Sequence, residues 1–121
     1  MTNFYINEVT YGGYLDKAAS GFVTKSGITA LWFSLKVQKA HNMFGFVSVM
    51  VYAPRLIELV EKYMIDANVG KRLVVSGETG FSTGQSQAAI LLLEKLTFVD
   101  QFIDESELDR KEANIPDFSN D

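Results

Sequence analysis

The fold is decided by residues 28–64, which read ITALWFSLKVQKAHNMFGFVSVMVYAPRLIELVEKYM. Apolar residues alternate with mixed ones over residues 28–39 and again over residues 44–52, and a period of two is typical of strands with one buried face. We expect the core faces to carry Leu31, Phe33, Leu35, Val37, Val47, Val49 and Val51. The opposite faces carry Trp32, Ser34, Lys36, Gln38, Phe44, Phe46, Ser48, Met50 and Tyr52.

A helix follows these two strands. Pro54 stands where a helix would begin, at a position that tolerates the missing N–H. Apolar residues then recur at spacings of three and four, which is one face of a helix, and we expect this helix to close at Asn68 or Gly70. That face carries Leu56, Leu59, Val60, Tyr63 and Met64.

The residues before this stretch predict a first strand. Residues 4–15 are rich in β-branched and aromatic types, and their Gly12-Gly13 pair indicates a bulge or a sharp bend. Residues 16–21 are loop-like, and residues 22–25 allow a short strand that ends at the turn Ser26-Gly27.

The residues after the helix predict two more strands. They are residues 72–78 and 87–99, joined by a loop over 79–86 that is rich in glycine and serine. The leucine run in the last strand would also suit a helix. Five strands with a helix between the third and fourth is the order of an OB-fold, so we expect a mainly β, five-stranded barrel. We expect Tyr11, Phe33 and Phe98 in its core.

Composition excludes several kinds of site. The chain has 121 residues, no cysteine and one histidine, His41, which excludes disulfides, thiolate metal sites and multi-histidine metal sites. No apolar run approaches the roughly 20 residues that span a bilayer, and the N-terminus lacks the pattern of a secretory signal. We therefore expect a cytoplasmic protein with no membrane partner.

The net charge of −4 is unevenly distributed. Residues 100–121 hold eight acidic and two basic residues, which leaves seven acidic and nine basic residues in the rest of the chain. A mildly basic body thus carries an acidic tail, which we expect to be unstructured beyond about residue 105. We expect a binding domain over residues 1–103 and an acidic tail over residues 104–121.

Motifs of catalysis are missing from the sequence. Ser20 and Ser26 precede glycines but lack the context of a nucleophile elbow, and residues 80–84 lack the lysine of a phosphate-binding loop. Glu58 and Glu61 lie on the polar face of the expected helix, where solvation explains them. We therefore expect a binding protein without turnover and without a cofactor.

Taken in order, six segments resemble the bacterial and phage single-stranded DNA-binding proteins of the small OB-fold type. These segments are residues 7–15, 24–27, 33–35, 47–51, 56–63 and 70–77. The short chain looks most like the lactococcal-type phage version. The resemblance implies a protein that coats and protects single-stranded DNA, independently of sequence, during phage replication, recombination and repair.

The resemblance also implies partners. The family's usual assembly is a homotetramer, with a dimer as the fallback, and strand one with Phe4, Tyr5 and Ile6 would be the pairing edge. The acidic tail would meet replication or recombination proteins, compete with DNA for the groove, or only confer solubility.

Binding single strands requires rings for base stacking and cations for phosphate contact. The candidate stacking residues are Trp32, Phe44, Phe46, Tyr52 and Phe81. The candidate phosphate contacts are Lys17, Lys25, Lys36, Lys39, Arg55, Lys71 and Arg72. Phe81 lies in a glycine- and serine-rich loop, where the resemblance also places a stacking aromatic.

Other interpretations remain open at this point. Trp32 could instead be a subunit-interface residue, and Phe44 and Phe46 could pack against the helix. The rings could also belong to an OB-fold protein–protein adaptor of the replication or primosome machinery. A third possibility is a small regulatory or structural phage protein that uses the fold without nucleic acid.

Overall fold

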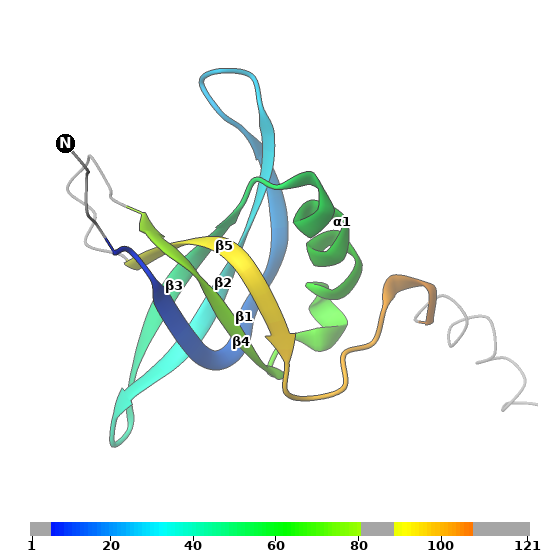
Figure 1. Cartoon of the computed structure of the whole chain (residues 1–121). Coiled ribbons are helices and arrows are strands. Elements are labelled where there is room, and N and C mark those ends of the chain that lie inside the picture. The colour runs from blue at the N-terminus through cyan, green and yellow to red at the C-terminus, as the bar shows by residue number, and fades with distance from the viewer. Residues whose placement is uncertain (1–5, 81–88, 108–121) are drawn as a thin grey trace, which may run out of the picture.

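The predicted order of elements is present in the chain. The computed structural model describes residues 6–80 and 89–107. Its elements are β1 (Val9–Val23), β2 (Thr29–Ala40), β3 (Met43–Val51), α1 (Pro54–Tyr63), the 3-10 helix η1 (Asp66–Asn68), β4 (Arg72–Gly80) and β5 (Ala89–Phe98). The strands form one closed barrel in the order β1-β2-β3-β5-β4, with α1 between β3 and β4 in the chain (Figure 1). The predicted OB-fold is thereby confirmed.

The β2–β3 hairpin supplies a large part of the core. Phe33 lies opposite Val49 and Leu35 lies opposite Val47 in the antiparallel register, and all four side chains are buried. The turn is tight enough to place Asn42 at a positive φ of 60°, which asparagine tolerates better than most residues. The predicted alternation holds in β3. In β2 it holds for Leu31, Phe33 and Leu35, but Ser34 on the opposite face is also buried and Val37 is only partly buried.

Strand β1 differs most from the prediction. Residues 16–21 are not a loop, because β1 continues through them to Val23 and pairs with β2. The register shifts between Leu15 and Lys17 and again between Lys17 and Ser20, which marks two irregularities in the pairing. Bulged positions interrupt the alternation of side chains, so the sequence pattern there is typical of a loop although the backbone is paired.

The Gly12-Gly13 pair lies in regular pairing with β4 and forms no bulge. At the next residue, Tyr14, β1 pairs with both β4 and β2. A Cβ at Gly13 would clash with the backbone carbonyl of Lys36 on β2. Glycine is therefore required where the strand passes from one neighbour to the other and the backbones approach closely.

Helix α1 covers one end of the barrel core. It begins at Pro54 and buries Leu56 and Val60, as the spacing predicted. The helix ends earlier than expected, at Tyr63, and the N–H of Met64 closes it on the carbonyl of Val60. Among the described residues, no helix is long and apolar enough to cross a membrane.

Strands β4 and β5 close the barrel. They pair with each other in antiparallel fashion, and β5 also pairs in parallel with β3, where Val49 lies opposite Leu91. The leucine run is therefore a strand, because both of its edges are occupied by neighbours. Leu91 and Leu93 are buried while Leu92 is only partly covered, as alternation requires.

The segment after β5 turns back onto the body. Phe102 is buried and stacks on Phe98 with ring centroids 4.5 Å apart. The side chain of Asn68, fully buried, donates to the carbonyls of Tyr63 and Ile103 and accepts from the N–H of Ile103. The segment that precedes the expected acidic tail is thus attached to the body by an apolar ring and a buried amide.

Candidate functional site

The outer face of β1, β2 and β3 carries the exposed rings. The register places Tyr14 of β1 opposite Lys36 of β2, and Lys36 opposite Phe46 of β3. Side chains of directly opposed residues start only about 4.5–5.5 Å apart, so these three form one row across the sheet. Phe44 is two residues from Phe46 along β3 and therefore on the same face, and its ring centroid lies 4.4 Å from the Nζ atom of Lys36.

These rings are unusually accessible for their size. The exposed fractions are 56% for Phe46, 43% for Phe44, 42% for Tyr52 and 40% for Tyr14. Phe44 and Phe46 therefore lie on the face opposite the core. Exposed apolar rings that share one face with a lysine indicate a binding surface.

A second group of rings lies at the other end of this face. Phe22 and Tyr52 meet edge to face, with centroids 6.2 Å apart, close to the buried Ala30. Trp32 lies between the two groups, opposite Ser20 and Met50, and is partly buried. The indole is therefore partly accessible on the predicted face.

Three of the predicted lysines lie at exposed positions of β1, β2 and the turn between them. Lys39 lies at the end of β2 with its side-chain carbons against Gly45 of β3, and because Gly45 alternates with Phe44 and Phe46, this contact is on the other face of the hairpin. Lys17 is exposed at the irregular part of β1. Lys25 is exposed in the turn between β1 and β2, which projects beyond the barrel (Figure 1).

Arg55 has a different environment. It lies in the first turn of α1 and lines a cleft in which three carboxylates outnumber one further cation; these residues are Glu58, Glu61, Glu105 and Lys62. Acidic neighbours oppose the approach of a phosphate. The structure therefore does not group Arg55 with the ring-bearing face.

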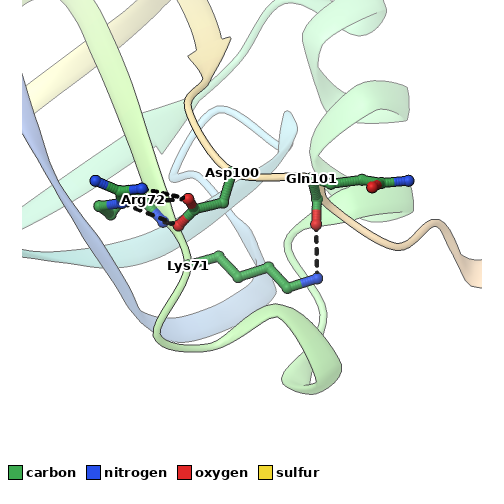
Figure 2. Close-up of polar contacts among 4 residues, drawn as sticks. All are labelled: Lys71, Arg72, Asp100 and Gln101. Atoms are coloured by element: carbon green, nitrogen blue, oxygen red, sulfur yellow. Dashed lines mark hydrogen bonds and ion pairs between the residues drawn. The ribbon is translucent and has the colours of Figure 1, made fainter.

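Lys71 and Arg72 are engaged by the C-terminal segment (Figure 2). The guanidinium of Arg72 donates to both carboxylate oxygens of Asp100, the shortest contact being 2.7 Å, and its backbone N–H donates to the same carboxylate. The Nζ atom of Lys71 donates to the carbonyl of Gln101 at 2.7 Å. Asp100 was counted among the acidic residues 100–121, but it is bonded to the body and lies within the expected binding domain over residues 1–103.

The ion pair shifts the titration of both partners. Hydrogen bonds donated by Arg72 lower the pKa of Asp100 below its ordinary value, and the same carboxylate raises the pKa of Arg72. Arg72 stays protonated in any case, so Asp100 is the partner whose charge can change.

We expect Asp100→Asn to lower the midpoint of thermal unfolding near neutral pH. Because the pKa of Asp100 is depressed in the folded chain, its stabilising effect is complete above the ordinary value of 3.8 and is lost as the pH falls through the lowered value. Circular dichroism melts over a pH series should show the wild-type advantage shrinking toward acid. The exposed Asp66→Asn is the control, and a pH-independent advantage would contradict the argument.

Sequence reasoning missed two rings on this face. Phe22 was omitted because the expected loop over residues 16–21 hid the continuity of β1, whereas Tyr14 lay within the expected first strand over residues 4–15. Alternation along the strand would have predicted an outward Tyr14 from an inward Leu15, and Leu15 is indeed buried. Phe81 and the edge residues Phe4 and Tyr5 lie outside the described residues, while Ile6 is exposed.

No family model and no curated protein sequence matches this chain. Among solved structures it is similar to a Plasmodium falciparum SSB in complex with ssDNA, at 20% identity and a TM-score of 0.61, covering 83% of this chain and 100% of that one. It is also similar to Rim1, a mitochondrial single-stranded DNA binding protein from S. cerevisiae, at 11% identity and a TM-score of 0.68, covering 81% and 98%.

A third similar structure is a small single-stranded DNA-binding protein from Streptomyces coelicolor. Its identity is 17% and its TM-score 0.55, with 75% of this chain and 92% of that chain covered. At these identities the likeness establishes the shared barrel architecture.

Proposed function

We propose that this protein binds single-stranded DNA on the outer face of β1, β2 and β3. The observation that carries the proposal is the row of Tyr14, Lys36 and Phe46, with Phe44 beside it, on an exposed sheet face. The strand 2–3 face is where OB-folds bind oligonucleotides. Likeness to barrels whose names describe single-stranded DNA binding supports the same assignment.

The mechanism is passive binding without turnover or cofactor. Each base stacked on a ring contributes roughly 1–3 kcal/mol, and every base has a face to stack. Lys36, Lys39 and the exposed Lys17 and Lys25 contact phosphates. Because the body carries little net charge, stacking supplies more of the affinity than charge does, and the dependence on salt is shallow.

The wider role follows from this binding. The protein coats and protects single strands during DNA replication, recombination and repair in the cytoplasm, in a phage setting, and it assembles as a homotetramer or a dimer. Trp32, Tyr52 and Phe81 add further stacking positions. Lys71 and Arg72 reach phosphates only after releasing Asp100 and Gln101.

A titration with oligo-dT tests the proposal. Trp32 is the single tryptophan, so its fluorescence reports on the face directly. We expect saturable quenching at low salt that weakens at high salt, with little difference between oligo-dT and guanine-free mixed sequences of equal length. Absence of binding at low salt would overturn the proposal and leave the protein–protein adaptor as the better account of the rings.

We further propose that the acidic tail over residues 104–121 competes with DNA. Two truncations separate its parts, since residues 104–107 hold three acidic residues and no basic one, whereas residues 108–121 hold four acidic residues together with Arg110 and Lys111. A chain that ends at residue 103 should bind oligo-dT more tightly at low salt than one that ends at residue 107. Equal affinities of both truncations and the full chain would mean that the tail only confers solubility.

A further inference from the structure

A groove opens at one end of the ring-bearing face. It lies between Tyr14 and Asp16 of β1, Lys36 of β2, Phe44 of β3 and Val69 in the turn before β4, and it has a volume of about 410 Å³. This volume falls within the range of about 300–1,000 Å³ that is usual for small-molecule sites. Tyr14, Phe44 and Val69 are each at least two-fifths exposed, so the groove is open to a ligand.

The walls of the groove suit a flat, uncharged ring. Tyr14 and Phe44 contribute aromatic surface, and Val69 adds an aliphatic side. Lys36 lies opposite Tyr14 in the register and over the ring of Phe44, which places one cation beside both aromatic side chains. A nucleobase that stacks here would therefore have its phosphate within the field of a lysine.

The groove also contains an acidic residue, Asp16, which contributes neither to base stacking nor to phosphate contact. This residue lies at the register shift between Leu15 and Lys17, and such irregularities re-aim side chains. Asp16 is partly buried, and its carboxylate makes no hydrogen bond or ion pair within residues 6–80 and 89–107. A free carboxylate repels a polyanion unless the ligand donates hydrogen bonds to it.

We propose that this groove binds a guanine base of the single strand. An ionised carboxylate accepts hydrogen bonds through two oxygens, and guanine alone presents two adjacent donors, N1–H and the N2 amino group, on its Watson–Crick edge. Thymine has one donor between two carbonyls. Cytosine and adenine each place one amino group beside a ring nitrogen that is an acceptor and that the carboxylate would repel.

This inference rests on the proposed function and refines one part of it. Stacking elsewhere on the face remains neutral to sequence, while the Asp16 groove adds a preference at one position per bound strand. The preference is modest because a single bidentate contact provides it.

Competition binding with defined oligonucleotides tests the inference on the full chain. The first probe is oligo-dT. The second is an oligonucleotide of the same length in which isolated dG residues are spaced to prevent guanine quadruplexes. In the third, inosine, which lacks the N2 amino group, replaces each of these dG residues. We expect the dG oligonucleotide to bind about five- to tenfold more tightly than oligo-dT, with inosine between them. The inosine comparison needs no protein variant.

The Asp16→Asn variant tests the proposed contact between the carboxylate and guanine by changing the protein instead of the DNA. It should bring the affinity ratio of dG to dT close to one while leaving oligo-dT binding equal or slightly tighter. Glu58→Gln on the exposed side of α1 removes the same charge and should keep the wild-type ratio. Failure of every probe to bind would overturn the proposed function itself.

Two outcomes would overturn only the guanine site. One is oligo-dT binding with no advantage for dG, and the other is a dG advantage that persists unchanged in Asp16→Asn. In either case single-strand binding would stand, and Asp16 would be a solvated surface acid.

Discussion

The variant with both Phe44→Ala and Phe46→Ala should bind oligo-dT about 100-fold or more weakly than the wild type, since each lost ring removes roughly 1–3 kcal/mol of stacking. The loss of Phe44 also removes the ring beneath the ammonium group of Lys36. Fluorescence anisotropy with a labelled oligonucleotide measures the change at fixed salt. Thermal stability should change little, because both rings are largely exposed.

Met43→Ala is the matched control for these rings. Met43 lies at the same end of β3 and is 59% exposed, but it offers no aromatic face. Its removal should weaken binding less than twofold, which corresponds to the small effects usual at exposed positions. Equal losses for Met43→Ala and the double variant would mean that apolar contact in general, and not stacking, drives binding.

Asn68→Ala should destabilise the fold by about 3 kcal/mol, because it leaves the N–H and carbonyl of Ile103 and the carbonyl of Tyr63 without their partner in a buried place. Urea unfolding followed by circular dichroism gives the free energy of unfolding. At a temperature where the variant is folded, its affinity for oligo-dT should equal that of the wild type.

Asn7→Ala provides a comparison within the same chain. Asn7 holds the N–H and carbonyl of Thr79 in a similar way, but it is only partly buried. Water can replace its hydrogen bonds, so the cost should be about 1 kcal/mol. Similar losses for Asn7→Ala and Asn68→Ala would show that burial of the Asn68 amide is not the reason for its effect.

The parts of the fold that follow a strict period were predictable from the sequence. Strands β2 and β3 and helix α1 each bury one face, so the spacing of apolar residues along each element indicates its conformation. Phe33, Val49 and Val60 are buried examples from the three elements. Strand β1 was only partly predictable. Its pairing shifts near Lys17 and Ser20, and a shifted register erases the alternation.

The candidate site shows the same division. Outward positions of Phe44, Phe46 and Tyr52 followed from alternation, and the structure places all three on the outer face. The engagement of Arg72 by Asp100 could not be predicted, because it joins residues far apart in the chain. Composition suggested a detached acidic segment there, whereas the buried ring of Phe102, the amide of Asn68 and the Arg72–Asp100 ion pair hold its start to the body.

The closed barrel has a consequence for how the chain folds. Its closure depends on pairs such as Val9 with Gly77 and Val47 with Ala89, which bring together residues distant in sequence. Topologies dominated by distant pairs fold slowly, typically in about milliseconds to seconds. During synthesis the edges of β1 and β3 stay unpaired until β4 and β5 have left the ribosome, so the nascent chain is most prone to aggregate in that interval.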